Sequence, residues 1–457
     1  MTTTYSRNRG LLGDLAARLT AGQTVIPEDA TYEQVRQLWN GRVKTRPAAI
    51  VRCLSVQDVI DTVRWTRTHG LPISVRGAGH DFAGRALSEN GIAIDLSQMR
   101  AVNIDPGGRT AHVQAGATAG DLIEAAERYG LATTTGSISS VGMAGFTLGG
   151  GYSPLLGAYG LGADNLLSAQ VVTADGQLLT ASVREHADLL WGLRGGGGNF
   201  GVVVSLEYRL HPLTTVLSGP LLYPLDQARA VLHRFNEFIA TAPDELTVIT
   251  GFIQTPEGST VLVLSPTYCG PLEDGEQAIA PLRTFGTLLV DQVQPVTYNA
   301  VIHAQDAIAP QGRHYYLQTQ SLKGFQTEAI EVLIEQGLPL PSPFSKILIH
   351  NFHGAASRVG ATETAFALRQ DHSMVELIAA WEPQSPSEEQ QHIQWAKNVS
   401  QALAPYALKG GYINALDEQE QERVPLAFGS NYERLVELKR TYDPNDVFRS
   451  TIGHITL

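Results

Sequence analysis

A histidine and three glycine-rich loops are the residues of this 457-residue chain best suited to hold a phosphate-bearing ligand. Glycines cluster at 77–79, 142–151 and 195–198, and such clusters leave backbone N–H groups free to surround an anion. The first loop, 76–81, reads Arg-Gly-Ala-Gly-His-Asp and places the imidazole of His80 beside these amides. A lone histidine in a turn is more often structural, and each loop alone is also compatible with tight packing.

The third loop contains the pattern GxGxxG at 196–201, which in a dinucleotide-binding fold follows a strand and begins a helix. Here the order is reversed, because residues 188–193 have a helical pattern and residues 202–206 read as a strand. In the first loop, Phe82 stands where the last glycine of the motif would be. Neither loop is therefore a Rossmann fingerprint.

Four glycine-containing segments in a fixed order carry a more specific signal than any loop alone. They read RGAGH (76–80), GSISSVGMAGFTLGGGY (136–152), YGLGADNLLSAQVVTADG (159–176) and LWGLRGGGGNFGVVVS (190–205). Together they resemble the FAD-binding domain of the vanillyl-alcohol-oxidase family, and within it the berberine-bridge-enzyme-like branch with its bacterial 6-hydroxynicotine-oxidase-like members. The segment NYERLVELKRTYDPNDVF (431–448) resembles the end of that branch. The resemblance covers most of residues 40–212 and 405–449 and is loose between them.

The resemblance implies an FAD-dependent oxidoreductase in which His80 matches the histidine bonded to the 8α-methyl carbon of the flavin. Many relatives add a second bond from a cysteine, and Ile138 occupies that position here, so we expect a single covalent bond. Asn165 is a further candidate support for the cofactor, with a loop cap as the equal alternative. The other positions that the resemblance assigns to FAD are Arg76, Gly77, Ala78, Gly79, Asp81, Gly136, Ser140, Val141, Gly142, Gly145, Gly149, Val203, Tyr412 and Asn414.

The resemblance also implies that a tyrosine takes part in catalysis. Tyr412, in Gly-Tyr-Ile-Asn at 411–414, matches the C-terminal tyrosine of the family, and Tyr152 matches a second tyrosine near the flavin. A phenol has a pKa of about 10, so it needs nearby positive charge or hydrogen bonds to accept a substrate proton near neutral pH. A hydride would then pass to flavin N5. A half-buried core tyrosine is the alternative for both residues.

Three further positions bear on the chemistry that the resemblance implies. Val141 stands where relatives carry a residue that controls the access of oxygen, and valine there favours an oxidase that makes hydrogen peroxide. The tail at 449–455 departs from the asparagine-rich tail of the family, and residues 360–362 lack a carboxylate that some relatives use. His350 or His353 could substitute for that carboxylate. Two histidines on a strand without a third ligand do not predict a metal site.

The first and last parts of the chain must position these residues. Strands at 49–53 and 71–75 flank a helix that Ser55 and Asp58 begin in a pattern resembling a capping box. Asp175-Gly176 between apolar runs predicts a hairpin at 171–179. The organisation that we expect is an FAD-binding domain at 1–212, with its PCMH-type core at about 45–212, and a C-terminal segment at 405–457 that returns to it.

The middle of the chain, residues 213–404, has a different character. Long amphipathic helices alternate with strands, which predicts an antiparallel sheet with helices on one face and a substrate-binding domain. The expected fold class is therefore α+β, with a two-domain PCMH-type FAD-binding fold. Tyr315, Tyr316 and Trp381 are candidate pocket residues, although aromatic side chains more often belong to a core. The helices are expected at 225–241 and 388–403 and the strands at 247–252 and 260–264.

The composition excludes several classes of protein. Hydrophobic residues make up 43% of the chain, which indicates a packed core. The net charge of −12 argues against nucleic acid and anionic membrane as partners. Two isolated cysteines, Cys53 and Cys269, predict neither a disulfide framework nor a thiolate zinc site. With no signal-peptide pattern and no stretch of 18 apolar residues, we expect a cytoplasmic enzyme.

Three functions are consistent with these features. The first is an oxidase that transfers a hydride from a small alcohol, sugar hydroxyl, amine or secondary metabolite to FAD and then electrons to molecular oxygen. The second is a dehydrogenase that uses a different electron acceptor. The third is a non-catalytic flavin-binding protein, against which the intact His80 and the three intact loops argue. The sequence does not identify the substrate or the oligomeric state.

Overall fold

The expected strand–helix–strand segment near residue 50 forms the start of a four-stranded sheet with the order β1-β2-β4-β3. In the computed structural model, which describes residues 12–383 and 386–457, α3 (Val56–Thr68) begins at the predicted capping box. Ser55 Oγ accepts from Asp58 N at 3.2 Å, and the Asp58 carboxylate accepts from Ser55 N at 3.0 Å. The strands are β1 (Gln23–Val25), β2 (Ala49–Arg52), β3 (Ile73–Arg76) and β4 (Ile92–Asp95). β3 ends where the first glycine loop begins.

A second sheet, with the order β5-β6-β10-β8-β9, completes the first half of the molecule and is antiparallel throughout. The Asp175-Gly176 hairpin joins β8 to β9 as predicted, and Gly176 has a φ of 76°, which favours glycine. The third glycine loop follows a helix and precedes a strand, so the reversed order is confirmed. The elements are β5 (Val102–Asp105), β6 (Thr110–Gln114), β8 (Leu166–Val172), β9 (Leu178–Ser182), β10 (Val202–Arg209), α4 (Ala119–Glu127), α5 (Met143–Leu148) and α7 (Ala187–Leu193).

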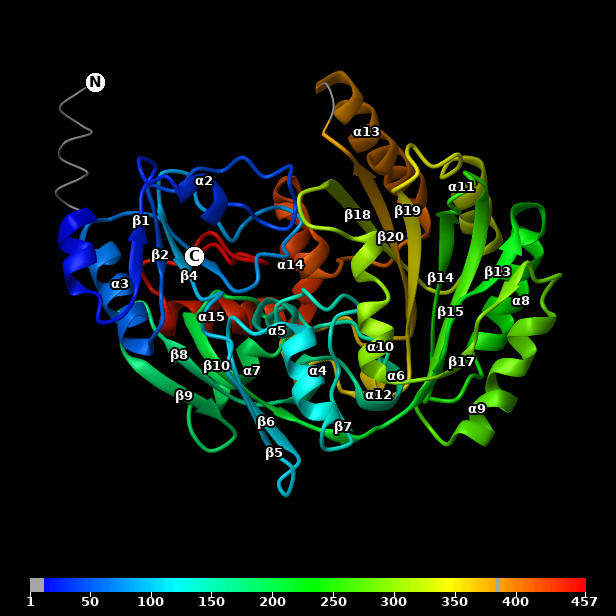
Figure 1. Cartoon of the computed structure of the whole chain (residues 1–457), viewed down its shortest axis with the longest axis horizontal. Coiled ribbons are helices and arrows are strands. Elements are labelled where there is room, and N and C mark those ends of the chain that lie inside the picture. Colours follow the sequence, from blue (N-terminus) through cyan, green and yellow to red (C-terminus); the bar gives the residue numbers. More distant parts are fainter. Residues whose placement is uncertain (1–11, 384–385) are drawn as a thin grey trace.

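The middle of the chain forms a third, antiparallel sheet with the main order β16-β13-β15-β14-β19-β20-β18. Helices α8 (Ala228–Ile239), α11 (Thr327–Glu335) and α13 (Pro386–Leu403) cover one face, and their apolar side chains pack on alternate strand residues such as Ile347 and Leu377. The predicted architecture of this part is therefore confirmed (Figure 1). The strands are β12 (Val216–Ser218), β13 (Leu221–Pro224), β14 (Leu246–Gln254), β15 (Thr260–Tyr268), β16 (Val290–Asp291), β17 (Gln294–Val296), β18 (His314–Leu322), β19 (Lys346–Phe352) and β20 (His372–Trp381).

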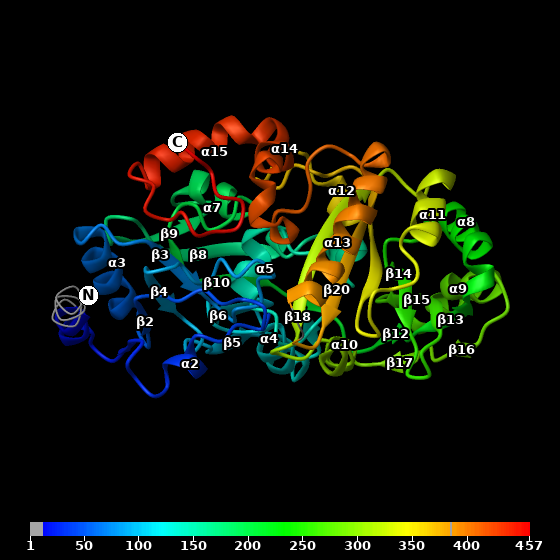
Figure 2. The ribbon, with the colours of Figure 1, turned by 90° about the horizontal axis from the view of Figure 1, so that it is seen from above.

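The C-terminal segment returns to the first half. Helix α15 (Tyr432–Tyr442) lies beside α7, as Figure 2 shows. The other short helices and strands are α2 (Tyr32–Val35), α6 (Leu156–Tyr159), α9 (Leu272–Ile279), α10 (Tyr298–His303), α12 (Ala355–Arg358), α14 (Val424–Phe428), β7 (Leu131–Ala132) and β11 (His211–Pro212). The 3₁₀ turns are η1 (Ala163–Asn165), η2 (Leu225–Gln227), η3 (Ala280–Thr284), η4 (Asp306–Ile308), η5 (Ala404–Tyr406), η6 (Ile413–Ala415), η7 (Glu418–Arg423) and η8 (Gly429–Asn431).

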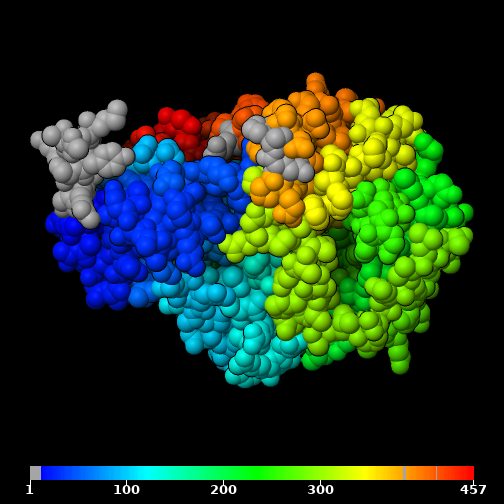
Figure 3. Space-filling model, turned by 45° about the horizontal axis from the view of Figure 1, so that its top comes forward, coloured from blue at the N-terminus to red at the C-terminus, as the bar shows by residue number. Residues whose placement is uncertain are grey.

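The two halves meet along the face of the third sheet that its helices leave uncovered. Leu317, Met374 and Ile378 of this face share a core with Trp39 and Tyr152 of the first half. Helix α10, although it lies within 213–404, packs on α4 of the first half. The space-filling view shows the N-terminal part and the middle of the chain in direct contact along this seam (Figure 3).

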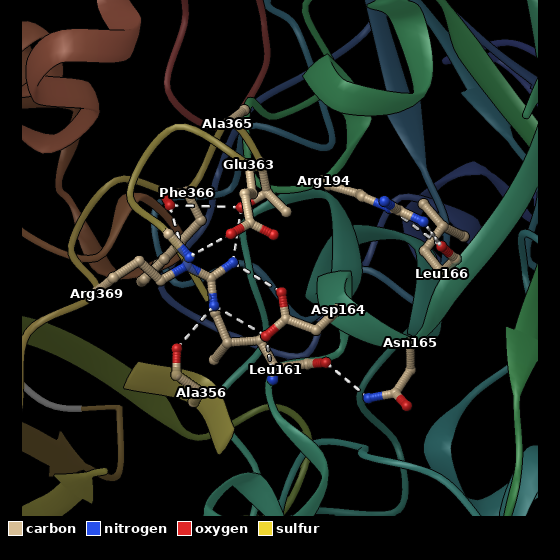
Figure 4. A network of polar contacts seen from close by, with 12 residues as sticks. Leu161, Asp164, Asn165, Leu166, Arg194, Ala356, Glu363, Ala365, Phe366 and Arg369 are labelled. Atoms are coloured by element: carbon tan, nitrogen blue, oxygen red, sulfur yellow. Dashed lines mark hydrogen bonds and ion pairs between the residues drawn. The ribbon is translucent and has the colours of Figure 1, made fainter. Parts of the chain in front are cut away.

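A buried ion pair fastens one part of the seam. The guanidinium of Arg369 donates to both oxygens of Asp164, at 2.9 and 2.7 Å, and also to Ala356 O at 3.0 Å (Figure 4). Arg369 is 4% exposed, so this network holds the loop before β20 against η1 without water between the charges. None of the helices in the described ranges is long and apolar enough to span a membrane.

Candidate active site

The largest group of predicted site residues lines one cavity between the glycine loops and the uncovered face of the third sheet. The cavity begins at the loop after β3, passes the second loop and ends at β18 and β20. It therefore joins both halves of the molecule. The predicted residues that line it are Gly77, Ala78, Gly79, His80, Asp81, Val141, Gly142, Gly145, Val203, Tyr412 and Asn414.

His80 lies in this cavity wall as a neutral imidazole. Its Nε2 and Ser140 Oγ are 3.1 Å apart and share a hydrogen bond. Burial lowers the pKa of His80 to about 4, although the charges of Asp306 and Asp81 act in the opposite direction. The ring therefore carries no charge at neutral pH, and a ring nitrogen has a lone pair available for bond formation.

Asp81, the next residue, has a structural partner rather than a free carboxylate. Burial raises its pKa, but the adjacent Arg85 guanidinium outweighs this effect and keeps the pKa below its ordinary value. The Asp81 carboxylate accepts from Arg85 Nη2 at 2.6 Å and from the Arg85 backbone N at 2.7 Å. Because Asp81 and Arg85 both line the cavity, their ion pair fixes the shape of the first loop.

The second loop has the shape expected of a cradle for a flat dinucleotide. A methyl group at Gly142 would lie 3.0 Å from Ala78 N, so only glycine allows the first and second loops to approach so closely. At Gly145 a methyl group would meet no atom within 4 Å and would project into the cavity. Asn414 Oδ1 is buried and has no hydrogen-bond partner among the described residues, although Asn414 lines the cavity. The residues present therefore fit FAD, whose flat ring system needs the open space that Gly145 leaves beside the cavity.

Tyr412 lies at the cavity wall with its hydroxyl oxygen held by two donors. Asn414 Nδ2 donates to it at 2.8 Å and Gly151 N at 3.2 Å. These bonds favour the phenolate, but burial outweighs them and raises the pKa of Tyr412 well above its ordinary value. The condition that we set for Tyr412 as a base, a lowered pKa, is not met by the protein groups around it.

Tyr152 lies beside Tyr412 but is not among the residues that line the cavity. It is buried behind the cavity, with its ring centroid 4.7 Å from that of Tyr412. Because His372 Nδ1 lies 2.8 Å from Gln370 O, its proton is on Nδ1, and His372 Nε2 accepts from the Tyr152 hydroxyl at 2.6 Å. Burial raises the pKa of Tyr152, and the structure gives Tyr152 no direct access to the cavity.

Glu376 is a cavity residue that the sequence did not reveal. It lies on β20 opposite Leu348 of β19, and its carboxylate accepts from His350 Nε2 at 3.1 Å. Leu317 of β18 lines the same wall. One signal in the sequence could have identified it, an acid within the apolar strand Met-Val-Glu-Leu-Ile at 374–378. A carboxylate in such a strand is rarely buried without a partner or a function. His350 therefore supports a carboxylate instead of replacing one.

The C-terminal tail is a second part of the cavity wall that only the structure identifies. Phe448, Ser450, Thr451 and Ile452 line it together with Gly198 and Gly201 of the third glycine loop. Thr451 Oγ1 accepts from Gly198 N at 3.1 Å. The tail therefore reaches the site even though its sequence departs from the family pattern.

The remaining predicted residues support the site from outside the cavity lining. Arg76 donates to Val35 O at 2.5 Å. Ser140 bonds His80, Gly136 makes room for the side chain of Val141, and Gly149 makes room for Asn414. Each of these four residues thus positions a neighbour.

Asn165 matches the loop-cap alternative. Its amide donates to Thr134 Oγ1, Tyr159 O and Leu161 O, and its Oδ1 bonds His211 Nε2 at 2.7 Å. Every polar atom of the side chain is occupied, and Figure 4 shows the amide nitrogen directed at Leu161 O. We therefore correct its assignment from cofactor contact to structural cap.

The other candidates lie away from the cavity. His353 packs against Gly157, and Trp381 belongs to the core beneath the helices. Tyr316 faces a second, smaller cavity beside Arg42 and Lys397. In the part of the chain that the structure describes, no group of three or more His, Cys, Asp or Glu side chains gathers in a way that could hold a metal.

Comparisons with known proteins match these features. Residues 47–182 match the family model described as FAD binding domain, and residues 411–453 match the model described as berberine and berberine like. The chain is 30% identical over 460 residues to FAD-linked oxidoreductase pgmH of Aspergillus terreus, covering 93% of this chain and 92% of that protein. It is 29% identical over 453 residues to (R)-6-hydroxynicotine oxidase of Paenarthrobacter nicotinovorans, covering 94% of this chain and 95% of the relative.

Solved structures show the same fold. The crystal structure of 6-hydroxy-D-nicotine oxidase from Arthrobacter nicotinovorans superposes with a TM-score of 0.85 at 28% identity, covering 95% of this chain and 98% of the other. A chitooligosaccharide oxidase superposes with a TM-score of 0.86 at 23% identity, covering 98% and 99%. At that identity the second likeness concerns the fold alone.

Proposed function

Because the chain belongs to the berberine-bridge-like FAD-linked oxidoreductases, we propose that it carries FAD on His80 and uses it to oxidise a small organic molecule with molecular oxygen. The observation that carries this proposal is the cavity itself. Its lining brings together the neutral imidazole of His80, the glycine loops, Glu376 and Tyr412. The imidazole suits the attachment of a cofactor, and the carboxylate of Glu376 suits the removal of a proton from a substrate.

The attachment of FAD to His80 is a two-electron oxidation, and molecular oxygen serves as the oxidant. A bond forms between a ring nitrogen of His80 and the 8α carbon of the flavin, while the imidazole loses its N–H proton and the methyl group loses one hydrogen with its electron pair. Oxygen takes up the two electrons and two protons as hydrogen peroxide. The low pKa of His80 supports this proposal, because the ring is neutral throughout the physiological range.

A single bond is proposed because no thiol lies near the second attachment position. Ile138 occupies that position and packs on the core shared by the two halves. Cys53 and Cys269 are buried in the core of the first half, and burial raises the pKa of both thiols. Acid denaturation should therefore leave FAD attached in the wild type and release all of it from the His80→Ala variant.

FAD, when bound, accepts two electrons from the substrate and passes them to an acceptor. We propose that the Glu376 carboxylate takes the proton from the hydroxyl or amine group of the substrate. His350 Nε2 holds one oxygen of this carboxylate, which fixes its direction toward the cavity. Tyr412 orients the substrate or the cofactor through its hydroxyl, whose own proton is retained because burial raises its pKa. Leu317 contributes apolar contact and helps to exclude water.

Val141 supports an oxidase over a dehydrogenase. It lines the cavity, and its γ-methyl groups fill the space beside Gly136. A branched side chain of this size leaves more room than leucine or isoleucine would. A dehydrogenase with another electron acceptor is the alternative within the same family.

One experiment with the purified protein tests the function. The visible spectrum should show bound flavin, and substrates should bleach it without oxygen and yield peroxide with oxygen. The panel should include 6-hydroxynicotine, simple alcohols, amines and sugars. Bleaching followed by slow recovery of colour in air would replace the oxidase by the dehydrogenase. A colourless protein, or a flavin that no compound in a broad panel bleaches, would reject the proposed enzyme.

A further inference from the structure

Trp39 makes a three-ring stack with His80 that the proposed reaction does not by itself require. The Trp39 and His80 ring centroids are 4.1 Å apart with an interplanar angle of 19°, and those of Trp39 and Tyr315 are 3.9 Å apart with an angle of 13°. Two rings cannot share one face of an indole at these separations, so His80 and Tyr315 lie on opposite faces. Phe82 closes the edge at 5.2 Å and 77°.

The indole is itself held firmly by polar contacts from both halves. Trp39 Nε1 donates to Ala309 O at 2.9 Å, and its backbone N donates to Gly79 O at 3.1 Å. The neighbouring Asn40 donates to Phe82 O at 2.7 Å and accepts from Tyr315 N at 3.0 Å. Trp39 is 5% exposed. The ring therefore cannot swing away from His80 without breaking contacts to the loop and to β18.

The stack leaves His80 few orientations. One face of its ring is covered by Trp39, and its Nε2 is bonded to Ser140. The acids that act on it are Asp81, which is paired with Arg85, and Asp306, which is paired with His303 at 2.8 Å and bonded by Ser139. Ser139 and Ser140 are adjacent, so one segment of the second loop holds both Asp306 and the imidazole.

We propose that Trp39 is a positioning residue that orients the His80 imidazole for attachment to the flavin and transmits the position of β18 to that bond. The inference rests on the proposed function, because it requires a bond from His80. An aromatic stack stabilises the orientation of its rings beyond their buried area, and here it acts on the one ring that must present a nitrogen to the cofactor. Trp39 touches neither the substrate nor the reacting carbon, so it is not a catalytic residue.

The test measures covalent attachment in the full-length protein. Apoprotein of each variant is mixed with FAD in air, and the flavin that stays with acid-precipitated protein is followed over time, beside the total flavin bound before precipitation. The Trp39→Leu variant removes the stack and should slow attachment by on the order of tenfold, with total binding nearly unchanged. The Trp39→Phe variant restores a ring and should recover most of the rate.

The chain offers a matched control in Trp65, which stacks on His69 with a centroid distance of 4.1 Å and an angle of 28°, away from the cavity. It is as buried as Trp39, at 3% exposure. The Trp65→Leu variant should cost stability but leave the rate of attachment unchanged. A second readout is the His80 pKa by NMR of the apoprotein, which should rise from about 4 in Trp39→Leu because water reaches the ring.

The outcomes separate the two proposals. Loss of all flavin from the acid-treated wild type would reject the His80 bond itself. Attachment at the wild-type rate in Trp39→Leu, while the wild type keeps its flavin, would overturn the role of Trp39 alone. Equal slowing in Trp39→Leu and Trp65→Leu would also overturn it, since the effect would then follow from lost stability. If Trp39→Leu misfolds, Tyr315→Leu takes its place, because it removes the ring that supports the other face of the indole. Slower attachment in Tyr315→Leu supports the proposal, and attachment at the wild-type rate overturns it.

Discussion

The carboxylate of Glu376 and the hydroxyl of Tyr412 line the same cavity but are held by different partners, His350 for the acid and Asn414 with Gly151 N for the tyrosine. Burial raises the pKa of Tyr412 despite two hydrogen bonds to its oxygen. The nearby charge of Glu376 raises that pKa further. At the scale of single residues, the raised pKa of Tyr412 supports the proposal that Glu376 accepts the proton of the substrate.

Replacing Glu376 by glutamine should slow reduction of the flavin by substrate by about a hundredfold or more, because a general base is lost while the shape is kept. Stopped-flow absorbance without oxygen measures this step. The Tyr412→Phe variant should show a smaller loss in the rate of flavin reduction, and both variants should keep their bound flavin and remain yellow. Glu382→Gln is the control, since Glu382 is exposed and pairs with Arg313 outside the cavity. A larger loss in Tyr412→Phe than in Glu376→Gln would return the role of base to the tyrosine.

Val141 carries the second prediction at this scale. Val141→Leu adds one methylene at the cavity wall and should slow reoxidation of the reduced enzyme by oxygen roughly tenfold, equivalent to about 1.4 kcal/mol of barrier. The measurement is stopped-flow mixing of the reduced enzyme with aerated buffer. Val141→Ala serves as the control that enlarges the space. Equal reoxidation rates in all three proteins would show that Val141 does not limit oxygen.

Residue types predicted the cofactor side of the site much better than the substrate side. His80 and the glycines could be recognised in the sequence because each glycine loop is a short, local stretch of backbone. Glu376 and Leu317 come from strands that are neighbours in space but separated by more than fifty residues in sequence. Their meeting depends on strand order and register, which no local pattern records. Asn165 was ambiguous because an amide suits a cap and a ligand equally well.

A buried lysine, Lys439, connects its helix to the loop and the tail that border one part of the cavity. Lys439 of α15 is 0% exposed, and its ammonium group bonds Asp443 Oδ2 at 2.7 Å, Asn199 O at 3.1 Å and Phe448 O at 3.2 Å. It also pairs with Asp446 at 3.0 Å. One side chain therefore connects α15 to the third glycine loop and to the tail that lines the cavity. The resemblance at 431–448 identified this segment as the end of the family pattern but could not show where its lysine points.

Removing this lysine should release the tail. Lys439→Met leaves the fully buried Asp443 without its partner, and breaking a buried pair in this way costs about 3–5 kcal/mol. The urea midpoint should fall accordingly, and proteolysis should cut the tail after α15 more readily. Lys323→Met, at an exposed position, should change neither. An unchanged midpoint in Lys439→Met would contradict the anchoring role.

At the scale of the whole molecule, two halves are held as one body around the cavity. The Arg369–Asp164 pair and the Trp39–Tyr315 stack cross the seam at different places. The sequence predicted the antiparallel sheet of residues 213–404 and its helices, because periodicity and turn residues act locally. It did not predict the seam, and the packing of α10 on α4 shows that spatial halves and sequence segments do not coincide at every element.

Buried neutral histidines make the stability of this assembly depend on pH. Burial lowers the pKa of His211 and His372 to about 4, whereas the unfolded chain titrates near 6.5. The unfolded state therefore binds protons first as the pH falls. Stability should be full above about pH 6.5 and should decline between that value and 4, with His372 alone contributing at most on the order of 3 kcal/mol.

Urea unfolding at several pH values checks this prediction. His372→Gln keeps an acceptor for the Tyr152 hydroxyl but removes the titrating group, so its midpoint should fall less steeply than that of the wild type as the pH is lowered. His112→Gln, at an exposed position, is the control. Parallel curves for the wild type and His372→Gln would show that this histidine does not contribute.

Successive side chains of β19 point to opposite faces of the third sheet, and the two faces have different roles. Ile347 and Ile349 face the helix-covered core, while Lys346, Leu348 and His350 face the cavity side, and the same alternation continues through β20. Selection can therefore exchange every second residue of these strands and redesign what the enzyme accepts while the core stays as it is. A small library confined to the cavity-facing positions should yield folded variants with new substrate ranges, which makes this sheet a surface on which one scaffold can diversify.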